Sequence, residues 1–304
     1  MFALRHSLWF VPPLVLLLAA SANTQVATTP AIEIFPDLVY GHKDGLALTL
    51  DVVKPKANAN GVAIVYLVSS GWFSTYSPPA EAVARSPDLL EPGFTVIYVR
   101  HGSSPKYQMP DIVSDVRRAV RFVRHNARRW GVDPNRLGAY GASAGGHLAL
   151  MLGTASDNGD AGAKEDFLKE SNRVAAVVAY YPPVDLRFSA SDLLAGSAPD
   201  ASGKCERYPA LNFDRAQAAD YSPLLRVSPD DPPTLLIHGD RDELVALKNS
   251  QLIYDAFQKN KVKSQLMIIA GAVHGFRGED AKRANAARVA WFEQTLLHSS
   301  RQFD

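Results

Sequence analysis

The sequence predicts an α/β protein with a mostly parallel central sheet and helices on both faces. Apolar strand-like runs alternate with amphipathic helical patterns through most of the 304 residues, and this alternation requires crossover connections between parallel strands. Hydrophobic residues make up 47% of the chain, which is enough to bury a sizeable core without disulfide or metal support. In addition, the stretch LGAYGASAGGHLAL places Ser143 among small residues where a strand-like run meets a helical one.

The first 22 residues are predicted to be a signal peptide. Two basic residues precede an apolar run at 8–20, and the small residues ASA at 20–22 form a cleavage pattern. An uncleaved membrane anchor is the alternative, but the run is short for a bilayer and two prolines interrupt it. We therefore expect cleavage near Ala22 and a periplasmic or secreted protein without a membrane anchor.

Two β-rich runs follow the leader, at 32–42 and 46–53, and they flank the turn residues Lys43, Asp44 and Gly45. An Asp-Gly pair between two such runs is typical of a hairpin. We therefore expect an antiparallel pair of strands at one edge of the sheet.

Six further runs are almost continuously apolar, which is the pattern of strands covered on both faces of a parallel sheet. They lie at 61–68, 93–99, 136–141, 174–181, 233–239 and 264–271. Helical patterns at 112–130, 145–153, 247–259 and 280–298 separate them. These elements predict one catalytic domain over residues 31–300. The interval 185–225 breaks the alternation and is too long for an ordinary connection, so it is interpreted as a small insertion over the active end.

Ser143 is the candidate nucleophile. A serine between a strand and a helix lies on a sharp turn, so its neighbours must lack bulk and its hydroxyl is exposed at the carboxyl end of the sheet. The pattern Gly-x-Ser-x-Gly is weak by itself, because an ordinary turn has the same composition. The assignment therefore depends on a base and an acid elsewhere in the chain.

An acid and a histidine follow the last two predicted strands, so the candidate residues occur in the chain order Ser, Asp, His. His274 is the favoured base, and His101, which also follows a strand, is its main rival. Asp242 is favoured as the acid over Asp240, because Asp240 directly follows the strand and is expected to tie down the turn. Glu243 is a further alternative.

The negative oxygen that develops on an attacked carbonyl needs hydrogen-bond donors. One is expected to be the backbone N–H of Ala144, the residue after the nucleophile. The second is expected from the loop after the run at 61–68, which reads SSGWF. The sequence therefore predicts an oxyanion site between the two loops.

These motifs resemble the α/β-hydrolase superfamily, and within it the bacterial esterase and lipase branch related to feruloyl and acetyl-xylan esterases. The similar stretches are GVDPNRLGAYGASAGGHLALMLGT, TLLIHGDRDELV and GAVHGF, and the resemblance covers roughly residues 45–298. It implies an α/β-hydrolase fold, with Ser143 as nucleophile, Asp242 as acid and His274 as base.

The resemblance departs from the family at the oxyanion loop. The branch carries His-Gly-Gly-Gly-Trp where this chain has VSSGW at 68–72. By position the backbone donors correspond to Ser70 and Gly71, although serine resists the left-handed backbone conformation that glycine adopts freely. Trp72 is a candidate contact for the substrate.

Together these observations predict an exported serine hydrolase that cleaves short-acyl or carbohydrate-linked carboxylic esters through an acyl-enzyme. A peptidase of the prolyl oligopeptidase type is one alternative, and a non-catalytic binding protein on the same scaffold is another. The net charge is +1 and no basic stripe is present, so a nucleic-acid partner is not expected. No residues show metal-ligand spacing, so neither a metal nor another cofactor is expected. The single cysteine, Cys205, permits no intramolecular disulfide.

Overall fold

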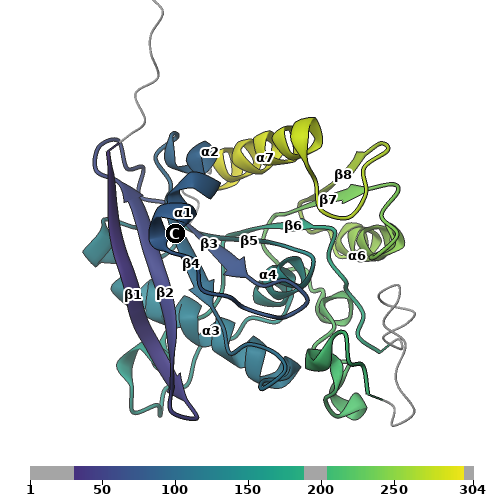
Figure 1. Ribbon diagram of the computed structural model, residues 1–304, viewed down its shortest axis with the longest axis horizontal. Coiled ribbons are helices and arrows are strands. Elements are labelled where there is room, and N and C mark those ends of the chain that lie inside the picture. The colour runs from purple at the N-terminus through teal and green to yellow at the C-terminus, as the bar shows by residue number, and fades with distance from the viewer. Residues whose placement is uncertain (1–30, 188–203, 298–304) are drawn as a thin grey trace, which may run out of the picture.

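The computed structural model describes residues 31–187 and 204–297, which build an eight-stranded sheet with helices on both faces (Figure 1). The strand order is β1-β2-β4-β3-β5-β6-β7-β8. The predicted signal peptide lies outside the described residues. The predicted domain limits of 31 and 300 stay predictions, as does the insertion at 185–225.

The first two strands form the expected antiparallel hairpin, which confirms that prediction. Strand β1 (Ile32–Lys43) pairs with β2 (Leu46–Pro55), and β1 forms one edge of the sheet. The turn residues Asp44 and Gly45 both have positive φ, at 50° and 76°, as a tight two-residue hairpin turn requires. Strand β2 also pairs antiparallel with β4, which joins the hairpin to the parallel part of the sheet.

Six strands run parallel and lie within a few residues of the predicted runs. They are β3 (Ala63–Val68), β4 (Thr95–Arg100), β5 (Leu137–Ala142), β6 (Ala176–Tyr180), β7 (Thr234–Gly239) and β8 (Ser264–Ile269). The expectation that all six are covered on both faces is wrong for β8, which forms the second edge of the sheet. Gln265 is exposed and Ile268 is 44% exposed, and these two residues lie on opposite faces of the strand, so neither face of this edge strand is completely covered.

The main helices are α1 (Pro79–Arg85), α2 (Pro87–Leu90), α3 (Met109–Asn126), α4 (Ala144–Thr154), α6 (Lys248–Lys259) and α7 (Gly278–Phe292). Figure 1 shows α1, α2 and α7 on one side of the sheet and α3, α4 and α6 on the other. Each group belongs to its own buried apolar cluster, which confirms the predicted layers. The sequence reasoning missed α1 and α2, because both are short and each begins at a proline within a polar segment.

Shorter helical turns complete the described chain. They are η1 (Ala127–Trp130), η2 (Asp166–Lys169), η3 (Pro209–Leu211), η4 (Arg215–Gln217), η5 (Pro223–Arg226) and η6 (Glu293–Leu297). Three of them, η3 to η5, follow residue 204 and belong wholly or partly to the interval 185–225. Among the described residues, no helix combines the length and apolar character needed to cross a membrane.

Candidate active site

Ser143 lies on the sharp turn between β5 and α4, as its neighbours predict. Its backbone has φ 54° and ψ −119°, a strained conformation for a residue that carries a side chain. The N–H of Ser143 donates to the carbonyl oxygen of Tyr180 at 2.8 Å, which holds the turn against β6. This contact with the neighbouring strand holds the serine in its strained conformation.

Close backbone packing explains the small residues around Ser143. A Cβ atom placed on Gly141 would lie 2.3 Å from the carbonyl carbon and oxygen of Gly145. A Cβ atom placed on Gly145 would lie 2.8 Å from the carbonyl oxygen of Leu67 in β3. Both distances are too short for real atoms, so these two positions tolerate only glycine without a shift of backbone.

Three side chains predicted from the sequence lie within hydrogen-bond reach of one another. The Nε2 atom of His274 is 3.1 Å from Oγ of Ser143, and its Nδ1 atom is 2.7 Å from Oδ2 of Asp242. Asp242 follows β7 and His274 follows β8, so the carboxyl ends of adjacent parallel strands bring them to one rim. Because a carboxylate only accepts, Nδ1 of the neutral imidazole carries the proton and Nε2 accepts from the serine hydroxyl.

The surroundings of Asp242 favour its charged form. Its carboxylate is buried, and Oδ1 accepts from the backbone N–H groups of Leu244 and Val245 at 2.9 and 2.8 Å. Burial alone would raise the pKa of Asp242. The hydrogen bonds from His238, His274 and Val245 outweigh that effect and hold the pKa well below its usual value. The side chain is therefore an anion that can orient His274.

Asp240, the rejected candidate acid, ties the two loops together. Its Oδ1 atom accepts from the N–H of Gly271 at 2.6 Å, and it is exposed. The adjacent Gly239 lies so close to the next loop that a Cβ atom there would be 2.2 Å from the carbonyl oxygen of Ala272. The structure thus gives Asp240 the turn-stabilising position that was expected for it, and Glu243 is exposed in the same loop.

His274 packs beside Tyr181, and their ring centroids are 4.5 Å apart. The imidazole is 21% exposed, so it is sheltered on one side and open to the pocket on the other. Tyr181 also packs edge-on against Phe276, with ring centroids 4.9 Å apart. These aromatic contacts limit the orientations of the imidazole and so support its alignment with Ser143.

His101, the rival candidate base, and His147, a second histidine near Ser143 in the sequence, bond elsewhere. Nε2 of His101 meets Ser69 at 2.9 Å rather than Ser143. Burial lowers the pKa of both His101 and His147 to about 4, so both imidazoles are neutral at pH 7. His147 is fully buried in α4, and its Nε2 donates to the carbonyl oxygen of Tyr221 at 2.8 Å. Neither histidine is placed to act as the base for Ser143.

The oxyanion loop differs from the expectation at Ser70. The Ser70 N–H donates to the carbonyl oxygen of Phe73 at 2.9 Å, and the Phe73 N–H donates back at 3.0 Å. The two residues between them, Gly71 and Trp72, have φ 56° and 63°, which makes a tight turn with two left-handed residues. The prediction of Ser70 as a backbone donor is therefore wrong, because its N–H is already bonded within the loop. The left-handed conformation falls on Gly71 and Trp72, so the serines do not have to adopt it.

Two N–H groups remain for a developing oxyanion. Ala144 is the first residue of α4, so its N–H has no acceptor within the helix. The Gly71 N–H has no acceptor among the described residues. Both residues line the same pocket as Ser143, which agrees with their predicted positions.

Trp72 lines the pocket but is almost completely buried. The residue is 1% exposed, its Nε1 donates to Nδ1 of His147 at 3.4 Å, and its ring packs edge-on against Tyr208. The predicted substrate contact of Trp72 therefore stays a prediction, and the contacts of its ring with His147 and Tyr208 support the loop. A left-handed turn directs this large apolar side chain into the core, where its burial is favourable.

The pocket beside Ser143 has a volume of ≈ 460 Å³. It is lined by Tyr66, Ser69, Ser70, Gly71, Trp72, Phe73, Ala142, Ser143, Ala144, Tyr181, Arg207, Tyr208, Leu244, His274 and Gly275. The sequence reasoning missed Tyr66, Tyr181, Arg207 and Tyr208. The first two belong to or directly follow strands that read simply as apolar, and the other two lie in the irregular interval.

The chemistry of this arrangement is that of an activated hydroxyl. A base and a buried carboxylate are aligned behind Ser143, and two N–H groups lie on the pocket wall. Among the residues that the structure describes, no group of three histidine, cysteine, aspartate or glutamate side chains is placed to hold a metal ion.

Comparisons with known proteins agree with the fold. A model of the family described as BD-FAE matches residues 50–257, more than half of the chain. Among curated proteins, the chain is 25% identical to esterase LipC of Mycobacterium tuberculosis over 277 residues, covering 88% of this chain and 66% of LipC. It is also 25% identical to the acetylxylan esterase of Xylanibacter ruminicola, covering 72% of this chain and 42% of that enzyme. The chain thus spans only 42% to 66% of the length of these two relatives.

Among solved structures, a truncated form of a carbohydrate esterase from gut microbiota is 26% identical, with a TM-score of 0.72. The match covers 88% of this chain and 98% of that one. An acetyl ester-xyloside bifunctional hydrolase from Caldicellulosiruptor lactoaceticus is 24% identical, with a TM-score of 0.69 and coverage of 88% and 98%, which is evidence of a shared fold.

Proposed function

The chain belongs to the BD-FAE family of α/β-hydrolases, and from this membership and the geometry at Ser143 we propose that it is a serine hydrolase of carboxylic esters. The observation that carries the proposal is the continuous hydrogen-bonded chain from Asp242 through His274 to Ser143, which opens into a pocket. A chain of this kind removes the proton that makes a serine hydroxyl a poor nucleophile.

In the first half of the proposed reaction, Oγ of Ser143 forms a bond to the ester carbonyl carbon while its proton passes to Nε2 of His274. The negative charge moves to the carbonyl oxygen, where the N–H groups of Ala144 and Gly71 donate to it. Asp242 stabilises the imidazolium that forms. The carbon–oxygen bond to the alcohol then breaks, and the alcohol leaves with the proton from His274.

In the second half, water attacks the acyl-enzyme and gives its proton to His274. The bond between Ser143 and the acyl carbon then breaks, which returns the proton to the serine and releases the acid. No redox step or external group is needed, because water supplies both the hydroxyl and the proton that the products carry.

We infer that the ester is small or linked to a carbohydrate. A pocket of ≈ 460 Å³ suits a short acyl group, and aromatic and hydroxyl side chains on its wall suit a polar alcohol. The acetylxylan esterase and the gut carbohydrate esterase, which this chain resembles, support the second class.

The decisive experiment measures hydrolysis of p-nitrophenyl acetate by the wild type and by Ser143→Ala. We expect turnover that the substitution abolishes, and we expect Ser171→Ala, a change at a half-buried residue outside the pocket, to retain it. An aminoacyl amide assayed in parallel tests the peptidase alternative. Turnover of the amide alone would replace the proposal with a peptidase, and turnover of neither compound would favour a non-catalytic binding protein.

Export is a separate proposal that rests on the leader at 1–22. Mass spectrometry of protein recovered from the periplasm or the medium should find a mature chain that begins close to residue 23. An intact leader on protein recovered only from membranes would overturn it and favour an anchor.

A further inference from the structure

A second serine and histidine pair lies in the pocket wall, outside the chain of Ser143, His274 and Asp242. Oγ of Ser69 is 2.9 Å from Nε2 of His101. Ser69 is half-buried and lines the pocket, whereas His101 is only 4% exposed and lies behind it. The proposed ester hydrolysis uses neither side chain.

The direction of this hydrogen bond follows from the partners of His101. Its Nδ1 atom is 2.9 Å from the carbonyl oxygen of Gly102, which can only accept, so Nδ1 carries a proton. Burial lowers the pKa of His101 to about 4, so the imidazole is neutral at pH 7 and has no second proton. Nε2 is therefore the acceptor, and the hydroxyl of Ser69 must be the donor.

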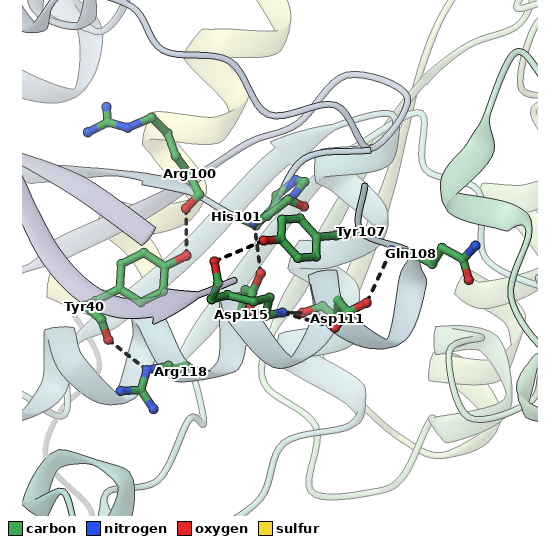
Figure 2. A network of polar contacts seen from close by, with 10 residues as sticks. Tyr40, Arg100, His101, Tyr107, Gln108, Asp111, Asp115 and Arg118 are labelled. Carbon is green, nitrogen blue, oxygen red and sulfur yellow. Dashed lines mark hydrogen bonds and ion pairs between the residues drawn. The ribbon is translucent and has the colours of Figure 1, made fainter. Parts of the chain in front are cut away.

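A network of polar contacts holds His101 in this position (Figure 2). The Gly102 N–H donates to Oδ2 of Asp115 in α3 at 2.9 Å, and Oδ1 of Asp115 is 2.6 Å from Nζ of Lys43. Asp115 is 2% exposed, so it needs these partners to offset the cost of burial. Figure 2 shows His101, Tyr107 and Asp115 beside one another. The contacts from Lys43 through Asp115 to the backbone next to His101 thus fix the orientation of the imidazole. No ligand is needed for this orientation.

A serine hydroxyl has one proton to donate and two lone pairs that accept. The hydroxyl of Ser69 already donates its hydrogen bond to His101. It can therefore only accept hydrogen bonds from a ligand in the pocket. A ligand with an O–H group satisfies such an oxygen, whereas a methyl group or an ether oxygen in the same place does not.

We propose that Ser69 is a specificity-determining residue that accepts a hydrogen bond from a hydroxyl group of the substrate, with His101 as the residue that positions it. The proposal rests on the proposed ester hydrolysis and narrows its substrate class to hydroxylated esters. The hydroxyl belongs either to the alcohol, as in a partly acylated polyol, or to the acyl group, and the experiment below separates these sources.

The experiment uses pairs of esters in which a hydroxyl replaces a methyl group of similar size. For the alcohol, 2-hydroxyethyl acetate is compared with propyl acetate, and for the acyl group, ethyl glycolate is compared with ethyl propionate. The quantity measured is the ratio of kcat/KM within each pair, for the wild type and for Ser69→Ala. Comparing that ratio between the two proteins cancels the different intrinsic reactivities of the esters.

We expect Ser69→Ala to lower the ratio of one pair by about 3- to 10-fold, as loss of one neutral hydrogen bond implies. The affected pair identifies the part of the substrate that carries the hydroxyl. Ser69→Thr, which keeps the hydroxyl, should retain the wild-type ratio. Ser70→Ala, a matched change at the adjacent position of the same wall, should leave both ratios unaltered.

A third pair tests the acceptor character of Ser69. The ether 2-methoxyethyl acetate carries an oxygen without a proton. The ratio of its kcat/KM to that of butyl acetate should therefore not fall in Ser69→Ala. His101→Phe removes the acceptor of the Ser69 hydroxyl, which can then donate to a ligand. The folded variant, verified by circular dichroism, should show a lower preference for the hydroxylated ester and a higher preference for the ether. Unchanged preferences in that folded protein would overturn the positioning role of His101.

Equal losses on both members of every pair would show that Ser69 merely supports the loop, and this result would overturn the inference while the proposed hydrolysis stands. Unaltered ratios in Ser69→Ala would overturn it as well. If the wild type cleaves none of the esters, the proposed function itself fails. The two failures are therefore distinguishable.

Discussion

Gly141→Ala tests whether close backbone packing positions the nucleophile. Gly141 lies two residues before Ser143, and an added Cβ atom would be 2.3 Å from the backbone of Gly145. Ordinary contact begins at 3.4 Å, so the two segments must separate by about 1.1 Å, the difference between 3.4 and 2.3 Å. The obstructing atoms are backbone, so no flexible side chain can move aside.

This separation is large compared with the tolerance of the site, because Ser143 lies between the two glycines. Oγ of Ser143 is 3.1 Å from Nε2 of His274, and a shift of about 1 Å would stretch that contact beyond hydrogen-bond reach. A misplacement of this size costs about 10²-fold in rate. We therefore expect kcat to fall about 10²-fold, with a smaller change in KM. Overpacking should also lower the free energy of unfolding by about 1–3 kcal/mol.

The assay is steady-state hydrolysis of p-nitrophenyl acetate, with urea denaturation to measure stability. Gly162→Ala is the matched control, because Gly162 is exposed, has no positive φ and has no atom closer than 3.4 Å to an added Cβ. It should retain wild-type activity and stability. A folded Gly141→Ala protein with wild-type kcat would refute the reasoning, since the sharp turn at Ser143 would then tolerate a side chain that the packing excludes.

Three further substitutions test the loops around the sharp turn at Ser143. Asp242→Asn should lower kcat about 10³- to 10⁴-fold in steady-state assays, because an amide favours the wrong tautomer of the base. The pKa of Asp242 is held below its ordinary value in the folded chain, so the stability it contributes is present above about pH 4 and is lost as the pH falls further. The difference in unfolding free energy between wild type and Asp242→Asn should therefore shrink in acid, as urea denaturation would show. Gly239→Ala places a Cβ atom 2.2 Å from the carbonyl oxygen of Ala272, so it should lower the unfolding free energy by about 1–3 kcal/mol and reduce kcat. Ser70→Ala should keep kcat within about 2-fold, because the substitution removes only the hydroxyl, and the proposed oxyanion donors are the backbone N–H groups of Ala144 and Gly71.

Each of these predictions has an opposite outcome. Retained turnover in Asp242→Asn would remove the carboxylate from the mechanism, and a stability difference that is as large at pH 2 as at pH 7 would contradict the lowered pKa of Asp242. Wild-type melting of Gly239→Ala would show that the two loops are less closely packed than the structure indicates. A large loss of kcat in Ser70→Ala would show that the hydroxyl of Ser70 takes part in the reaction.

Local sequence patterns were sufficient for the layers and for the sharp turn that carries Ser143. Continuous apolar runs and helical periodicity indicate which faces are buried. The period of the apolar pattern distinguishes strands from helices. The small residues around Ser143 record a close approach of backbone within a few residues of the chain. His274 and Asp242 follow predicted strands, and parallel strands bring their carboxyl ends together. These inferences need only short-range patterns and the topology that such patterns require.

Contacts between distant segments were decided by the tertiary structure. The exposure of residues in β8 depends on which strand ends the sheet, and the burial of Trp72 depends on a left-handed turn in the oxyanion loop. The same turn commits the Ser70 N–H to its own loop. The pairing of Ser69 with His101, 32 residues away, has no periodic signature. Hydrogen-bond partners across such separations depend on loop paths and strand register, which apolar periodicity does not encode.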